Sequence, residues 1–356
     1  MNAREKFRRI MRFEDVDSIP VLALEPYEAE MQSLWESQGH LKRGQAPEQR
    51  LGMDALEMIP VNFGPIPGFN RKRLWEDEEY YAETEFMGGV VKRKKEAPTR
   101  YYGFIEHPVK CPDDWYEYKK RFLPDPGRLM FDPEDAVEEY KNCENPVGVH
   151  LFPFFFRLGF YTLGMAGFME AFYLEPEMMH DMFGYWSDFV IETIRPLLEK
   201  VKPDFVTLTE DLAYKGATHV SPAIYENFWL PYQNKVVSFI QNYEVEVISL
   251  WSAGKLDCIM DLAVGNGINC TWPLERASGI DPHGLRAKYG KRLSMAGGMP
   301  TKALIGGKDM IDGAIEELTP LILQGGFFPA LDDMVLPDIS FENYEYYIKR
   351  LKEIKL

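Results

Sequence analysis

Eight short, largely apolar runs recur along the chain, separated by longer segments in which apolar residues return with helical spacing. Several of the runs are continuously apolar rather than alternating, which is typical of strands buried on both faces of a parallel sheet. The predicted strands cover residues 18–25, 54–61, 147–153, 204–210, 246–251, 268–275, 292–299 and 326–332.

The segments between these runs predict helices, the clearest over residues 176–201, 221–243 and 308–324. Strands that alternate with helices favour a parallel sheet, and eight such strands favour a closed (β/α)8 TIM barrel. An open doubly wound α/β sheet is the alternative, but no GxGxxG motif follows the first predicted strand. We therefore expect residues 1–356 to form a single barrel domain of the α/β class.

Residues 75–112 interrupt this alternation. Polar and aromatic residues there surround a Gly-Gly pair and the sequence Ala-Pro-Thr-Arg, a pattern typical of short antiparallel strands joined by turns. We predict a small antiparallel β insertion between the second and third barrel strands. It could cover the mouth of the barrel, or it could be a surface ribbon with no role in the site.

The composition is that of an ordinary globular protein, with 46% apolar and 27% charged residues. The formal net charge of −16 argues against a nucleic-acid or anionic-membrane surface, because no basic face stands out. The four cysteines lack CxxC spacing, and no signal peptide or membrane-spanning apolar run is visible. We expect a reduced, cytoplasmic protein that binds neither nucleic acid nor membrane.

The ends of the predicted strands carry acids, aromatic residues and one histidine. In (β/α)8 barrels the chemistry takes place at the C-terminal ends of the strands, and this mixture suggests an apolar pocket with a few polar anchors. Strand-to-helix loops also favour Asp as a helix cap, so each single acid has a structural explanation as well. The predicted substrate-binding residues are Glu25, Tyr27, His150, Phe154, Trp251, Trp272, Glu275, Asp332 and Asp333.

The sequence LTEDLAYKG follows the fourth apolar run and places two carboxylates, Glu210 and Asp211, side by side. Adjacent carboxylates push their pKa values apart, which can keep one acid protonated near neutral pH. Together with Tyr214 and Lys215 they are the predicted catalytic residues. The structural alternative is that Asp211 caps the following turn while Glu210 pairs with Lys215, and the sequence does not decide between the two.

Four blocks of the sequence resemble the uroporphyrinogen decarboxylase superfamily, in the same order and spacing over nearly the whole chain. These blocks include AREKFRRIMRFEDVDSIPV, EDLAYKGATHVSPAIYENFWLPY, WSAGKLDCIMDLAVGNGINC and GGFFPALDDMVLPDISF. The resemblance implies a (β/α)8 barrel, in agreement with the strand count. It also implies an activity from a group that includes uroporphyrinogen decarboxylase, corrinoid-dependent methyltransferases and relatives of cobalamin-independent methionine synthase.

One departure from the superfamily concerns the substrate's carboxylates. True uroporphyrinogen decarboxylases carry an arginine-rich segment after the first strand, which holds those carboxylates. This chain has LEPYEAEMQ at residues 24–32, with acids and no arginine. A polyanionic porphyrinogen would be repelled there, so uroporphyrinogen decarboxylase activity is not expected.

A second departure concerns zinc. The zinc-dependent methyltransferases carry His-x-Cys at the end of the fifth strand and another cysteine near the end of the eighth, whereas this chain has Trp-Ser-Ala at 251–253 and LDDMVLP. Zinc prefers imidazole and thiolate ligands, so the usual thiol-activating site is missing. An oxygen-ligated metal on Glu210, Glu275 or Asp332 is left open.

The resemblance then implies a methyltransferase that acts on the methyl donor, as in corrinoid O-demethylase systems. The implied donor is a small methoxylated molecule, aromatic because Phe, Trp and Met residues gather at the strand ends. The implied partner is a separate corrinoid-binding protein, and a homodimer is left open. The leaving oxygen needs protonation or stabilisation, which a carboxylic acid of raised pKa, Tyr214 or Lys215 could provide.

Two other classes of function stay open. A decarboxylase or lyase of a small acid needs cationic residues in the mouth, and Arg157 and Lys215 are the clear candidates. A non-catalytic binding barrel is favoured by Trp251 and Ala253, because relatives often have polar residues there.

Overall fold

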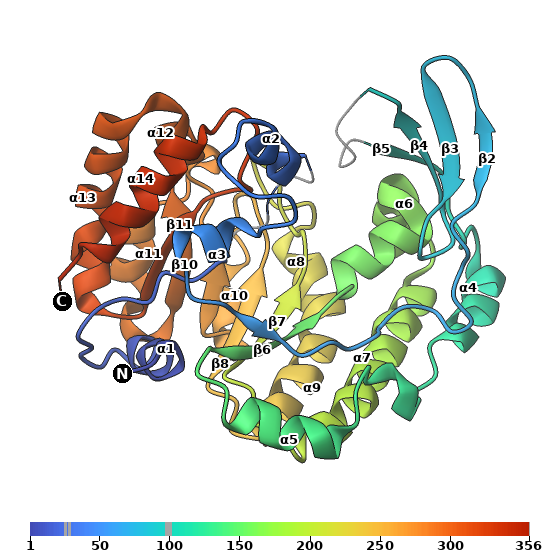
Figure 1. Cartoon of the computed structure of the whole chain (residues 1–356). Coiled ribbons are helices and arrows are strands. Elements are labelled where there is room, and N and C mark those ends of the chain that lie inside the picture. The colour runs from blue at the N-terminus through green and yellow to red at the C-terminus, as the bar shows by residue number, and fades with distance from the viewer. Residues whose placement is uncertain (25–26, 28–29, 97–101, 356) are drawn as a thin grey trace.

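Seven parallel strands form one curled sheet in sequential order, and four antiparallel strands form a second sheet (Figure 1). The structure is a computed structural model that describes residues 1–24, 27, 30–96 and 102–355. The parallel strands are β1 Glu57–Met58, β6 Val147–Leu151, β7 Phe205–Thr209, β8 Val247–Trp251, β9 Cys270–Trp272, β10 Ser294–Met299 and β11 Phe327–Leu331.

The first predicted strand, residues 18–25, does not form a regular strand over its described part. Leu22 makes a single parallel bridge to Asp54. Pro20 has no N–H to donate, and the N–H of Val21 donates to the side chain of Asp54 at 2.9 Å instead of to a backbone carbonyl. The fold is therefore an α/β fold with a curled, seven-stranded parallel sheet. A closed (β/α)8 barrel requires the first strand as well, so the closed barrel stays a prediction.

Helices connect most of the parallel strands and lie around the outside of the curled sheet (Figure 1). They are α1 Ala3–Met11, α2 Met31–Ser37, α3 Pro47–Leu51, α4 Pro112–Tyr118, α5 Pro133–Lys141, α6 Phe155–Leu174, α7 Pro176–Leu198, α8 Pro222–Ile224, α9 Leu230–Gln241, α10 Met260–Gly265, α11 Pro282–Tyr289, α12 Thr301–Gly306, α13 Lys308–Gln324 and α14 Phe341–Lys352. Among the described residues, none of these helices combines the length and apolar character that crossing a bilayer requires.

The predicted helix over residues 221–243 is broken near its start. A π-helical turn, Tyr225–Trp229, separates α8 from α9. Pro231 has no N–H to donate to the carbonyl of residue 227, so the regular α-helical ladder cannot run through this point. Within this turn, the indole N–H of Trp229 donates a hydrogen bond to the carboxylate of Glu210, which follows β7.

The antiparallel sheet stands in the chain between β1 and β6 and projects beyond the main body (Figure 1). Its strands are β2 Arg73–Glu76, β3 Tyr80–Thr84, β4 Val90–Lys94 and β5 Tyr102–Glu106, against a predicted range of 75–112, of which residues 97–101 lie outside the described part. Phe104 packs edge-on against Phe160 of α6 with ring centroids 5.4 Å apart. Phe86, between β3 and β4, stacks at 6.3 Å on Phe152, which follows β6. One edge of this sheet therefore lies beside the C-terminal ends of the parallel strands.

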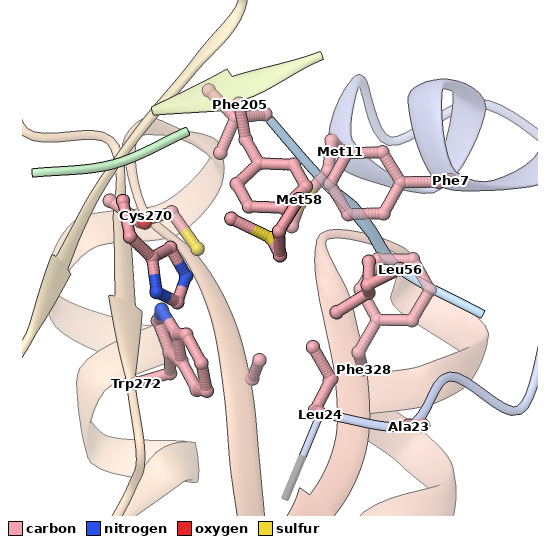
Figure 2. A pocket seen from close by; sticks show the side chains of 14 residues that line it. Phe7, Met11, Ala23, Leu24, Leu56, Met58, Phe205, Cys270, Trp272 and Phe328 are labelled. Atoms are coloured by element: carbon pink, nitrogen blue, oxygen red, sulfur yellow. The ribbon is translucent and has the colours of Figure 1, made fainter. Parts of the chain in front are cut away.

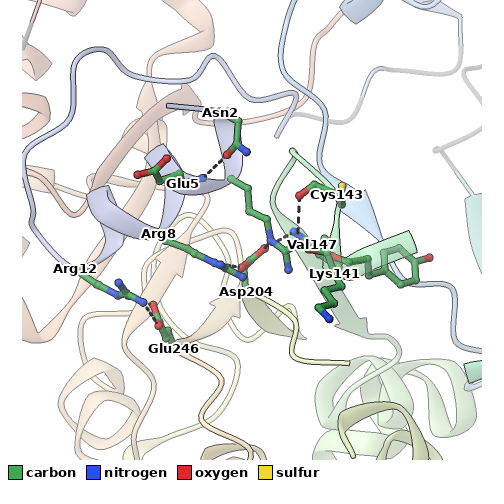
Figure 3. A network of polar contacts seen from close by, with 11 residues as sticks. Asn2, Glu5, Arg8, Arg12, Lys141, Cys143, Val147, Asp204 and Glu246 are labelled. Atoms are coloured by element: carbon green, nitrogen blue, oxygen red, sulfur yellow. Dashed lines mark hydrogen bonds and ion pairs between the residues drawn. The ribbon is translucent and has the colours of Figure 1, made fainter. Parts of the chain in front are cut away.

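Helix α1 is tied to the N-terminal ends of the parallel strands by ion pairs (Figure 3). Asp204, the buried residue just before β7, accepts hydrogen bonds from Arg4 at 2.8 Å and from Arg8. Arg12 pairs with Glu246, just before β8. Because both carboxylates precede strands, these contacts hold α1 across the end of the sheet opposite to the expected site.

The apolar side of α1 fills this end of the sheet. The ring of Phe7 lies 5.7 Å from that of Phe205 at the start of β7 and 5.3 Å from that of Phe328 in β11. Met11, one turn further, faces the same interior space. The N-terminal end of the sheet is thus closed by α1.

Candidate functional site

The side chains of β7 alternate between the inside of the curled sheet and the surrounding helices. Phe205 lines a cavity inside the sheet, and Thr207 shares a 2.6 Å hydrogen bond with Ser249 of β8, which lines the same cavity. The same alternation, continued past the strand end, places Asp211 on the inner side and Glu210 on the helix side. The two adjacent carboxylates therefore face different surroundings.

Glu210 is completely buried between the sheet and the helices. One carboxyl oxygen accepts a 2.6 Å hydrogen bond from the backbone N–H of Phe156 in the first turn of α6, and the other accepts a 3.0 Å bond from Trp229 Nε1. Burial raises the pKa of Glu210 to about 8, and the charge of Asp211 contributes least to that rise. The geometry favours a role for Glu210 in anchoring α6, and a catalytic role stays a prediction.

Neither contact of the structural alternative for LTEDLAYKG, an Asp211 cap or a Glu210–Lys215 ion pair, is among the contacts of the described residues. Glu210 is held by α6 and the π-helical turn instead. Lys215 is exposed. Tyr214 is 54% exposed, with its ring 5.3 Å from that of His219. Tyr214 and Lys215, two of the four predicted catalytic residues, therefore lie on the surface of the loop after β7.

Asp211 forms an ion pair with Arg157 of α6, with 3.0 Å between Oδ2 and Nη2. Burial raises the pKa of Asp211, while the positive charges of Arg157 and His219 oppose the rise and Glu275 adds to it. A carboxyl group on which burial and a cationic partner act in opposite directions responds to small changes in its surroundings. A role for Asp211 in proton transfer stays a prediction.

Arg157 is the main site residue that the strand-end argument misses, because it stands in the first turn of the following helix. Its guanidinium carbon lies 5.8 Å from the ring centroid of Trp251. Its Nε atom is buried and has no hydrogen-bond partner among the described residues. A buried donor without a partner is costly, so this N–H is available for an oxygen atom of a ligand. The sequence names Arg157 only for the lyase alternative.

His219 is a second residue that the sequence does not single out. Its ring stacks on that of Phe156 with 5.1 Å between centroids. Burial lowers the pKa of His219, while the negative charge of Asp211 opposes that shift. It belongs to the irregular segment between β7 and α8, where no strand or helix pattern marks it.

A row of rings crosses the ends of β8, β9 and β6. The ring of Trp251 lies 6.4 Å from that of Trp272, which lies 6.1 Å from that of His150. Burial lowers the pKa of His150 to about 4, so its imidazole is neutral at neutral pH. We call the region formed by Arg157, Asp211 and these three rings the mouth.

A cavity of about 180 Å³ lies inside the curled sheet (Figure 2). Its wall includes Trp272 and His150, which also belong to the mouth. Most of its walls are formed by apolar side chains, including those of two methionines. His150, Ser249 and Cys270 are the more polar wall residues. Burial raises the pKa of Cys270 to about 12, so this thiol stays protonated and unreactive.

Asp332, the other acid that directly ends an apolar strand, is also held by hydrogen bonds. Its Oδ1 accepts from both the backbone N–H and the hydroxyl of Thr301 at 2.7 Å, and its Oδ2 accepts from the N–H of Arg276 at 3.0 Å. Burial raises the pKa of Asp332, against these hydrogen bonds. The contacts indicate an anchor for the start of α12.

The two remaining acids differ in their surroundings. Glu275 accepts a 2.8 Å hydrogen bond from the N–H of Gly254 and lies near enough to raise the pKa of Asp211. Asp333 is exposed and accepts from the N–H of Met334. The described residues contain no group of three or more His, Cys, Asp and Glu side chains that could hold a metal ion.

The aromatic candidates outside the mouth pack elsewhere. The hydroxyl of Tyr27 lies 3.1 Å from that of Tyr344 in α14. Phe154 is completely buried, with its ring 4.3 Å from that of Phe155. Glu25 lies outside the described residues. Of the predicted substrate-binding residues that the structure describes, only the histidine and one tryptophan line the cavity.

Together, the curled parallel sheet and the site at its strand ends define an α/β protein of the barrel type. Its sequence matches the uroporphyrinogen decarboxylase (URO-D) family model over residues 156–354, and the chain belongs to this family. The resemblance found in the sequence is therefore confirmed.

The fold is also similar to that of solved structures. A methyltransferase from Methanosarcina mazei is 12% identical, with a TM-score of 0.62 and 99% of each chain covered. A B12-independent methionine synthase from a Shewanella species is 10% identical, with a TM-score of 0.42 and 94% of each chain covered. No curated protein matches the sequence.

Proposed function

We propose that this protein is a methyltransferase that moves a methyl group from a small methoxylated aromatic donor to the corrinoid of a partner protein, as in O-demethylase systems. The observation that carries the proposal is an apolar, ring-sized cavity whose wall residue Trp272 is connected through the ring of Trp251 to the ion pair of Asp211 with Arg157. Such a site binds a mostly apolar molecule and directs one polar atom of it. Membership of an enzyme family supports the proposal.

The chemistry needs help at the oxygen atom that the methyl group leaves. The methyl–oxygen bond breaks, its electron pair stays on oxygen, and the methyl group passes to the nucleophile that the partner's reduced corrinoid supplies. The new negative charge on oxygen is stabilised by a proton or by a nearby cation. Arg157 has a buried N–H without a partner for this oxygen, and Asp211 beside it can carry the proton.

His150 and the two tryptophans position the donor in this account. A neutral imidazole can hydrogen-bond an uncharged ether oxygen, and the low pKa of His150 keeps it neutral. Trp251 and Trp272 offer ring faces and edges for an aromatic ring. These three side chains bind the donor without contributing a charge. The charged groups that assist methyl transfer are therefore Asp211 and Arg157.

The partner's corrinoid reaches the site from the C-terminal side of the strands, because α1 closes the other end. Two exposed rings, Phe86 and Phe152, stand at this side next to Tyr161 of α6. They provide apolar surface for a partner that covers the mouth. The proposal assigns no metal to the chain itself.

A direct experiment combines the purified protein, a reduced corrinoid partner and a panel of methoxylated aromatics. We expect the absorption spectrum of the corrinoid to change as it accepts the methyl group from at least one donor. An unchanged spectrum with every donor, from correctly folded protein and a functional partner, would overturn the proposal.

A decarboxylase or lyase of a small acid is the second candidate, because the free Nε of Arg157 also suits a carboxylate oxygen. The two candidates differ in product. Incubation with methoxylated aromatic acids should release carbon dioxide under the second proposal, with no need for a corrinoid partner.

A further inference from the structure

The cavity exists because small side chains face inward on three neighbouring strands. Ser249, Cys270 and Ala296 line it from β8, β9 and β10, and strand pairing places Ser249 directly opposite Cys270. In closed barrels, bulky branched residues dominate such inward positions and fill the interior. The small residues at these inward positions therefore leave this part of the sheet interior unfilled.

Larger side chains bound the open space from the other side. Leu56, Met58 and Phe328 face the cysteine across it (Figure 2). The volume of about 180 Å³ matches that of an apolar cavity of roughly 150 Å³ that holds one benzene ring. Met58 and Phe328 are the large side chains on this side, so we expect a second fused ring to press against one of them.

The interior offers nothing for a charged or strongly polar group. The hydroxyl of Ser249 already shares its hydrogen bond with Thr207, and the thiol of Cys270 is protonated. His150 contributes a neutral ring. A charge placed here would lose its hydration without gaining a partner, so an occupant must be apolar over the part that enters.

The cavity adjoins the mouth on one side. His150 and Trp272 line the cavity and also belong to the mouth, where both are partly exposed. At the opposite end, Phe7 and Phe205 are buried and pack against each other.

We propose that this cavity, the ring chamber, binds one six-membered aromatic ring of the substrate, with the oxygen-bearing edge toward His150 and Trp272. The inference rests on the proposed function for the identity of the substrate. It adds that the donor is monocyclic and uncharged over its buried part. Methoxybenzenes are accepted, and methoxynaphthalenes are excluded by size.

Ring binding can be measured without any corrinoid, which separates this inference from the proposed function. Calorimetric titration of the protein with anisole and with a methoxynaphthalene should show binding of the first and much weaker binding of the second. The variant Ala296→Leu fills the chamber and should weaken anisole binding by roughly tenfold or more. It should keep or raise the melting temperature, because it fills a void. Ala166→Leu, at an exposed position of α6, is the matched control.

A second variant makes the test independent of how well the first one folds. Met58→Ala enlarges the chamber and should let the methoxynaphthalene bind at least as well as anisole. Two results would overturn the inference: equal anisole binding by the wild-type protein and Ala296→Leu, or no anisole binding by the wild-type protein. A size preference that Met58→Ala leaves unchanged would also count against it. Ring binding without methyl transfer would instead leave the chamber intact and remove the proposed function.

Discussion

Two pairs of carboxylates at the strand ends are held in opposite ways. Glu210 and Asp332 are buried, and each accepts hydrogen bonds from the first turn of a helix and from one further N–H. Asp211 and Glu275 are partly exposed, and Asp211 faces an arginine that keeps an unused donor. The comparison teaches that the end of a strand does not by itself identify a functional acid. The face to which the side chain points, and how many of its hydrogen bonds are already taken, decide its role.

The largest expected effect is on turnover at Asp211. Asp211→Asn keeps the size of the side chain but removes its proton transfer and its charge beside Arg157, so methyl transfer should slow by roughly 10²- to 10⁴-fold. The melting temperature should change little, because Asp211 is partly exposed. Single-turnover rates and thermal unfolding measure the two effects. A rate close to that of the wild-type protein would show that Asp211 only orients Arg157.

The second-largest expected effect is on the pH dependence of the free energy of unfolding, to which the buried Glu210 contributes. The pKa of Glu210 is about 8 in the folded protein and near 4.5 in the unfolded chain, so the folded state holds the proton more tightly. The stability that the protonated Glu210 side chain contributes is fully present below about pH 4.5 and is lost as pH rises to about 8. Relative to Glu210→Gln, the wild-type protein should lose up to about 5 kcal/mol over this range. Denaturant unfolding at several pH values measures this difference. A pH-independent difference would contradict the raised pKa.

At acidic pH, where Glu210 is neutral, replacing it should still cost stability. In Glu210→Gln the amide NH2 must face either the Phe156 N–H or the Trp229 indole N–H, so one buried donor loses its acceptor. We expect a loss of about 1–3 kcal/mol in unfolding free energy, with turnover per folded molecule changed only a few-fold. Glu170→Gln, at an exposed position of α6, is the control. A severe loss of turnover with unchanged stability would support the catalytic role predicted for Glu210.

The smallest effect is expected at Arg157. Arg157→Lys keeps the positive charge near Asp211 but removes the planar group and its Nε–H. Because the positive charge that stabilises the leaving oxygen survives, kcat for methyl transfer should fall by only about three- to tenfold. Steady-state kinetics with a saturating partner measures this change. No change in KM or kcat would show that the unpaired Nε–H does not contact the substrate.

Most of the sheet was predictable because its strands are continuously apolar. Seven of the eight predicted strands form, in the predicted parallel arrangement. Over its described residues the first does not, because Pro20 lacks a donor and the Asp54 side chain takes the N–H of Val21. The break in the helix over 221–243 follows from Pro231. The spacing of apolar residues, from which the helix was predicted, takes no account of this proline.

The site was predictable only in part. Asp211, Trp251, Trp272 and His150 follow from the strand ends, and β alternation in the sequence already separates Asp211 from Glu210. Arg157 could not be found in this way, because its role depends on how the first turn of α6 folds back over β7 and β8.

The most direct test of the account follows an isotopically labelled methyl group. Wild-type protein, Glu210→Gln and Asp211→Asn are each mixed at equal folded concentration with a labelled methoxybenzene and the reduced corrinoid partner, in a single turnover. The account predicts transfer of the label to the partner at similar rates for the wild-type protein and Glu210→Gln, and at a rate roughly 100-fold lower for Asp211→Asn. No transfer by the wild-type protein, or equal rates for all three proteins, would contradict it.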